Sequence, residues 1–193
     1  MRPIERSEIL PIGDYEQVRE RFRARVIQEK RPRRVKVGDH LSAVLENRDS
    51  VLLQIQEMLR TERISSEPAI KHEIETYNEL IPGADELSLT VFVEIPEREV
   101  RDRMLIELAG LERHVGIEVN GERIMASSGP RPGAVEDRTT AVHYMKIPLP
   151  EGAARALKER RATAALVVTH PRYEARADLP SATLAKIAED LSE

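Results

Sequence analysis

Charged residues interrupt an otherwise apolar stripe in the segment 47–63. The apolar residues of this segment recur at the spacing of one helix face: Val51, Leu52, Ile55, Met58 and Leu59. Glu62 falls within the stripe, four residues after Met58, and Arg48 lies near its centre line. A carboxylate that faces a core is costly unless it is paired or binds a metal. Glu62 is therefore a candidate base or metal ligand, unless the helix frays there or an arginine pairs with it.

Five histidines and no cysteine limit the metal chemistry open to this chain. Without thiolates, a transition-metal site must use imidazole and carboxylate ligands. His143 shares one face of a predicted strand with apolar neighbours, and none of the histidines has the spacing of a metal-binding motif. His40, Glu62 and His143 are the candidate ligands of a divalent metal, whose identity is open. The alternative for each histidine is a structural group with its hydrogen bonds satisfied.

An acid–base enzyme is a second use of the same residues. Glu57 or Glu62 would act as the base and His143 as the acid, and both roles require pKa values displaced by burial and neighbouring charges. The candidate catalytic residues, Glu57, Glu62 and His143, must then converge on one cleft. The sequence contains neither a glycine-rich nucleotide loop nor a GxSxG nucleophile motif, so those enzyme classes have no support.

A basic block occupies residues 19–36, with nine lysines and arginines against two glutamates. Such a block can neutralise phosphates, and it makes an adaptor that binds a protein or a nucleic acid a third alternative. Its one aromatic residue, Phe22, provides no stacking platform for single strands. The net charge of −4 gives no general attraction to nucleic acid, which is therefore disfavoured as the partner. A solvated helix face with acidic partners elsewhere on the surface explains the block as well.

The composition is that of a soluble globular protein, with 40% apolar and 33% charged residues. Aromatic residues make up only 3% and tryptophan is absent, so the core must be aliphatic. The lack of cysteine excludes disulfides and a cysteine nucleophile. The N-terminus does not resemble a signal peptide, and no run approaches the roughly 18 apolar residues of a membrane-spanning helix. We therefore expect a cytoplasmic protein without membrane contact.

Hydrophobic periodicity and turn residues divide the chain into helices and strands. Helices are predicted at 7–30, 47–63, 66–81, 97–109 and 153–161, and from Ser181 onward. Strands are predicted at 35–45, 87–95, 115–126, 141–148, 163–169 and 173–177. The segment 35–45 is broken by Gly38-Asp39, as a hairpin or a bent strand, and 115–126 is a hairpin around Asn120-Gly121. The aperiodic segment 127–140 is predicted to be a long loop.

These elements must position the candidate residues within one domain. A length of 193 residues fits a single domain, which we assign to residues 1–193. The connections between strands in the second half are mostly short, which favours antiparallel pairing. The predicted fold class is α+β, with an antiparallel sheet and helices packed on one face and at the end.

Six sequence blocks resemble a bacterial family known only as a domain of unknown function. The blocks cover residues 34–40, 46–51, 54–60, 77–82, 139–144 and 170–173, so the resemblance runs over nearly the whole chain. The resemblance implies a role beside a rubrerythrin and an iron–sulfur oxidoreductase related to heterodisulfide reductase subunits. It does not imply any particular activity for this chain. Thr169 stands where the family pattern has an aspartate before His-Pro, which argues against catalysis in that block.

The matched blocks also contain polar residues that core packing does not explain. The candidate ligand-binding residues among them are Arg48, Gln56, Arg60, Tyr77 and Asn78. Together with the stripe, they are consistent with one wall of a polar pocket between a helix and a sheet. Our leading hypothesis is a small-ligand or metal-binding accessory protein of a bacterial redox or oxidative-stress system, with an iron–sulfur oxidoreductase or rubrerythrin as partner.

Overall fold

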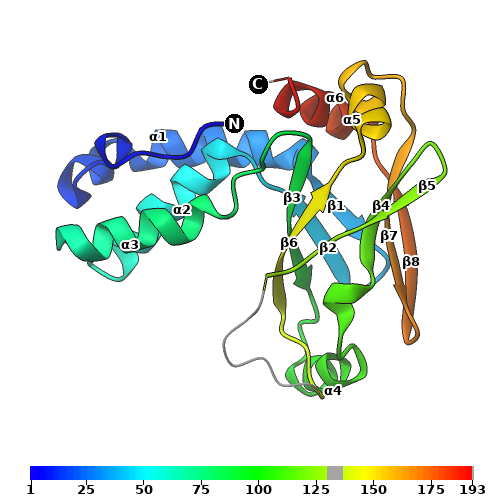
Figure 1. Ribbon diagram of the computed structural model, residues 1–193. Coiled ribbons are helices and arrows are strands. Elements are labelled where there is room, and N and C mark those ends of the chain that lie inside the picture. Colours follow the sequence, from blue (N-terminus) through cyan, green and yellow to red (C-terminus); the bar gives the residue numbers. More distant parts are fainter. Residues whose placement is uncertain (130–136, 193) are drawn as a thin grey trace.

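Two four-stranded antiparallel sheets and six α-helices make up the described part of the chain (Figure 1). The computed structural model describes residues 1–129 and 137–192. The predicted α+β class is confirmed, although the strands divide between two sheets. The predicted loop 127–140 lies partly outside the described residues.

The first sheet supports the layer of helices that contains the candidate site. It contains, in spatial order, β1 (Arg34–Val37), β2 (Leu41–Leu45), β3 (Glu86–Val93) and β6 (Val142–Pro148). Gly38, with a φ of 70°, forms the tight turn between β1 and β2, so the segment 35–45 is a hairpin. Strand residues alternate between faces, so Leu89 and Val91 point into the core while Thr90 points outward. That outward face is covered by helices.

The second sheet packs against the inner face of the first. It contains, in spatial order, β5 (Glu122–Met125), β4 (Val115–Val119), β7 (Ala164–His170) and β8 (Tyr173–Asp178). The β4–β5 hairpin turns at Asn120 and Gly121 and pairs Ile117 with Ile124, as predicted. The core between the sheets is largely aliphatic. Backbone hydrogen bonds between Ser127 and Lys146 join the sheets along one edge.

Helices lie on one side of the first sheet and at both ends of the sandwich (Figure 1). The side layer consists of α1 (Ile12–Lys30), α2 (Arg48–Thr61) and α3 (Glu67–Asn78). The ends are covered by α4 (Arg98–Glu107) at one end and by α5 (Glu151–Lys158) and α6 (Ser181–Asp190) at the other. The side layer has its own smaller core, which includes Val51, Ile55, Leu59, Ile70 and Ile74. The predicted placement of helices on one face and at the end is confirmed.

The first helix is shorter than predicted. It begins at Ile12, with Pro11 as its N-cap, whereas Arg6–Glu8 form a separate 3-10 turn. Proline has no backbone N–H and its ring clashes with a preceding helical turn, so the helix cannot extend through Pro11 toward residue 7. The residues before Pro11 leave the helix axis and run across the other helices of the side layer.

Candidate functional site

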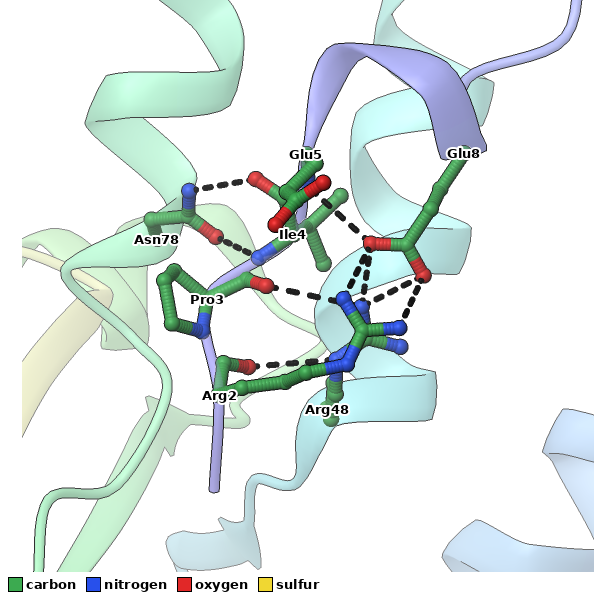
Figure 2. A network of polar contacts seen from close by, with 7 residues as sticks. All are labelled: Arg2, Pro3, Ile4, Glu5, Glu8, Arg48 and Asn78. Carbon is green, nitrogen blue, oxygen red and sulfur yellow. Dashed lines mark hydrogen bonds and ion pairs between the residues drawn. The ribbon is translucent and has the colours of Figure 1, made fainter.

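Residues 2–10, which we call the N-terminal strap, lie across α2 and α3 (Figure 2). The strap contains one 3-10 turn and pairs with no strand. Ile4 and Ile9 are its apolar anchors and are buried in the core of the helical layer. Between these anchors the strap is held by polar side chains of α2 and α3. Three of the predicted ligand-binding residues turn out to make these contacts.

Arg48 binds the strap through its guanidinium group (Figure 2). Its Nε donates to the carbonyl oxygen of Arg2 at 3.1 Å, and another nitrogen donates to the Glu8 carboxylate at 2.6 Å. Arg2 also donates to both oxygens of Glu8, at 2.9 and 3.0 Å. The hydrogen bond from Arg48 is the main cause that lowers the pKa of Glu8 to about 2. Arg48 therefore fixes the strap to the first turn of α2.

Gln56 and Asn78 form hydrogen bonds to the strap backbone through their side-chain amides. The Oε1 of Gln56 accepts from the Leu10 N–H at 2.7 Å, and its Nε2 donates to the Leu10 carbonyl at 3.2 Å. Asn78 makes the same pair of bonds to Ile4, both at 2.9 Å. A carboxamide can donate and accept at once, so each satisfies both backbone groups of one residue. The two amides clamp the ends of the strap.

Glu57 is engaged by α1. It accepts from Tyr15 Oη at 2.6 Å and from two nitrogens of Arg19, each at 2.8 Å. The Arg19 hydrogen bonds are the main cause that lowers the pKa of Glu57 to about 2. Burial is the main cause that raises the pKa of Tyr15. A carboxylate with so low a pKa is a poor proton acceptor at neutral pH, so this arrangement does not favour Glu57 as a base.

The remaining α2 and α3 candidates point in different directions. Arg60 donates to Glu16 of α1. Tyr77 is half-buried at the end of α3, and burial is the main cause that raises its pKa. Glu62 is exposed, because α2 ends at Thr61 and Glu62 is its C-cap. The alternative in which the helix ends before this carboxylate can face the core is thus the one found.

The candidate histidines lie away from α2. His143 is buried on the inner face of β6, where its Nε2 is 3.0 Å from Thr139 Oγ1. It pairs with Val91, whose side chain faces the sandwich core, whereas Thr90 on the outer face donates to Glu46, which precedes α2. His40 is the last residue of the β1–β2 turn, and its backbone N–H donates to Tyr173 Oη at 3.0 Å.

The candidate metal ligands are therefore not assembled. Across residues 1–129 and 137–192, no group of three or more His, Asp or Glu side chains is arranged to hold a metal ion. His40, Glu62 and His143 accordingly do not form one site there. Glu62 and His143, as acid–base partners, would need one shared cleft, but Glu62 is exposed at the end of α2 and His143 is inside the sandwich.

A buried carboxylate that we did not select as a candidate joins the helices to the sheet. Glu46 accepts from Thr90 Oγ1 of β3 at 2.8 Å and from Ser50 Oγ of α2. Lys30 Nζ of α1 lies 3.6 Å from the same carboxylate. The sequence signal was weak, since Glu46 directly precedes the Asn47 cap of α2 and reads as part of a helix start.

The basic block 19–36 is largely neutralised inside the molecule. Its intramolecular ion pairs are Arg19–Glu57, Arg23–Glu57, Arg25–Asp49, Lys30–Glu46, Arg33–Asp190 and Arg34–Glu94. Arg33 is buried, so its pair with Asp190 is part of the fold. These pairs support the alternative in which acidic partners on the protein's own surface account for the block.

A pocket of about 410 Å³ lies between α1, α2 and the strap. Its apolar lining comes from all three: Leu10 of the strap, Val18 and Phe22 of α1, and Leu52 of α2. The polar residues around it are Glu8, Tyr15, Arg21, Arg25 and Gln56. Gln56 is thus the one predicted ligand-binding residue that lines this pocket, and α2 is one of its walls. The opposite wall is α1 and the strap, not the sheet.

The fold and the pocket define a small α+β protein with two antiparallel sheets and a strapped helical layer. Over residues 3–191 the chain matches the family described as protein of unknown function, DUF3501, and it belongs to that family. A crystal structure at 1.90 Å resolution, described as a novel protein of unknown function from Burkholderia pseudomallei K96243, is 30% identical to this chain. The alignment covers 98% of this chain and 100% of that one, with a TM-score of 0.92.

These comparisons confirm the resemblance to a family of unknown function and indicate no activity. The comparison with curated proteins found no match. None of the helices in the described residues is both long and apolar enough to span a membrane.

Proposed function

We propose that this protein binds a small molecule in the pocket between α1, α2 and the strap. It would serve as an accessory protein of a bacterial redox or oxidative-stress system. The observation that carries the proposal is the pocket itself, whose volume of about 410 Å³ falls in the range of small-molecule sites. The apolar lining supports it further, because Leu10, Val18, Phe22 and Leu52 come together around one hollow from three segments of the chain.

The surrounding chemistry favours binding over catalysis. Glu57 is locked into an ion pair with Arg19, and His143 lies on the far side of the first sheet. Arg48, Gln56 and Asn78 form hydrogen bonds with the strap. None of the described residues that line the pocket form a glutamate–histidine pair, and the lining instead offers shape and apolar surface. The redox setting rests on the family resemblance alone, with an iron–sulfur oxidoreductase or a rubrerythrin as the proposed partner.

A fluorescent apolar probe tests the proposal directly. N-Phenyl-1-naphthylamine, which carries no charge at neutral pH, should bind the purified full chain with saturation and a rise in fluorescence. Leu52→Trp should weaken that binding, because the larger side chain occupies part of the pocket. Ile27→Trp is the matched control, since Ile27 is exposed on α1 and does not line the pocket. Absence of saturable binding, or equal binding by the Leu52→Trp variant, would contradict the proposal.

A further inference from the structure

We infer that the ligand of this pocket is an amphipathic monoanion, with an aliphatic tail and one carboxylate headgroup. The inference rests on the proposed function, because it names the chemical class that the same pocket takes. Some polar and charged groups of the pocket lining already have hydrogen-bond or ion-pair partners within the protein, and the remaining group is left for a ligand.

The neutral polar groups of the lining are already satisfied. Tyr15 donates its hydroxyl hydrogen to Glu57 at 2.6 Å, and the amide of Gln56 is bonded on both sides to the Leu10 backbone. These residues therefore contribute mainly the carbon parts of their side chains to the pocket. Together with Val18, Phe22 and Leu52 they form a surface that favours an apolar molecular body.

The charged groups of the lining leave a positive charge. Glu8 is compensated by Arg2 and Arg48, which both donate to its carboxylate. Arg25 is compensated by Asp49 and lies 5.3 Å from the centroid of the Phe22 ring. Arg21, by contrast, is solvent-exposed at the pocket and makes no ion pair within residues 1–129 and 137–192. Its guanidinium is the one cation of the lining with no acidic partner among them.

A free guanidinium beside an apolar wall selects for a complementary ligand. A carboxylate accepts two parallel hydrogen bonds from a guanidinium, and such charge-assisted bonds are stronger than neutral ones. An aliphatic tail attached to that carboxylate would lie against Leu52 and Phe22 and would be removed from water. A neutral molecule would leave the charge of Arg21 unused, and a cationic one would be repelled by it.

Three ligands with one tail and different head charges test the inference. Calorimetric titration of the full chain should show octanoate binding several-fold more tightly than octanol, and octylammonium binding more weakly than octanol. Arg21→Gln should reduce octanoate affinity about threefold to fivefold, because a pair with an exposed guanidinium is screened by water, and should leave octanol unchanged. Arg21→Glu should reverse the preference toward octylammonium. Arg23→Gln is the matched control, because Arg23 lies on the same helix but does not line the pocket.

The outcomes separate this inference from the proposed function. Equal affinity for octanoate and octanol, or an Arg21→Gln variant that retains the full difference, would overturn the monoanion class while the pocket could still bind the fluorescent probe. Absence of binding by all three ligands would overturn it as well. In that case the probe experiment, with Leu52→Trp, decides whether the pocket binds small molecules at all.

Discussion

Single polar residues of α2 act on the protein's own backbone and carboxylates. Arg48 and Gln56 face the strap, and Glu57 faces α1. Each would be costly to bury without partners, and each has them. Arg48 and Gln56 occupy their positions on α2 because they bind the strap, and Glu57 occupies its position because it binds α1. The pocket forms where these two segments meet α2.

Replacing Arg48 is expected to weaken the protein measurably. Arg48→Gln removes the charged donor to Glu8, and a hydrogen bond to a charged group contributes about 1–3 kcal/mol. Urea denaturation should show a decrease of that size in the free energy of unfolding. Arg6→Gln is the control, because the Arg6–Glu67 pair is exposed and should contribute little. Equal losses in the two variants would contradict a special role for Arg48.

Acid is expected to destabilise the protein through Glu8 and Glu57. Both carboxyls have a pKa of about 2 in the folded chain against the usual 4.5. A carboxyl whose pKa is lower in the folded chain than in the unfolded chain stabilises the folded state. This stabilisation is complete above the unfolded-state pKa and is lost as the pH falls through the folded-state pKa. The free energy of unfolding should therefore fall between about pH 4.5 and 2. Urea titrations of the double variant Glu8→Gln, Glu57→Gln should show a shallower fall.

At the scale of elements, the strap takes the place of a longer first helix. Because it pairs with no strand, its few hydrogen bonds come from the side chains of α2 and α3 and from its own short turn. The strap also supplies Glu8 and Leu10 to the pocket lining. The position of the strap therefore determines the shape of the pocket, since any motion of the strap away from α2 removes part of the pocket wall.

Loosening one clamp should free the N-terminal end of the strap. Asn78→Ala removes both hydrogen bonds to Ile4, which together contribute about 1–3 kcal/mol. Hydrogen exchange of the full chain should show at least tenfold faster exchange at the Ile4 amide, with the sandwich strands unchanged. Gln28→Ala on the exposed side of α1 is the control. Unchanged exchange at Ile4 would show that the apolar anchors alone hold the strap.

At the scale of the whole molecule, two cores are joined by a few buried polar contacts. The sandwich core and the helical core are separate clusters. Glu46 links β3 to α1 and α2 at their junction, and the buried Arg33 joins the end of α1 to α6 through Asp190. Such contacts orient the helical layer on the sheet, because a buried charge tolerates only the geometry that satisfies it.

Removing Glu46 should uncouple the helical layer from the sandwich. Glu46→Ala leaves Thr90 and Ser50 without their acceptor and Lys30 without its counter-ion. Loss of one partner from such a buried group costs on the order of 3 kcal/mol. Hydrogen exchange should accelerate in α1 and α2 more than in the sheet strands. Glu94→Ala, which breaks the exposed pair with Arg34, is the control. Uniform acceleration in both layers would contradict a junction role.

Most helices and strands could be predicted from local patterns. The β4–β5 hairpin and its Ile117–Ile124 pair follow from Asn-Gly, and the apolar stripe of α2 follows from its helical period. Turn chemistry and side-chain periodicity depend on residues close together in the chain. The strap is absent from the prediction, because the helix predicted for residues 7–30 includes Pro11, whereas α1 begins only after that proline.

The aliphatic core, the α+β class and the presence of polar residues that need partners follow from composition and local patterns. The identity of those partners depends on tertiary packing. Arg48 meets Glu8 across 40 residues, Gln56 meets Leu10 across 46, and Asn78 meets Ile4 across 74. Local propensity carries no information about such pairs, because they form only when packing brings distant segments together. The pocket arises in the same way, from three segments that neither spacing nor composition relates to one another.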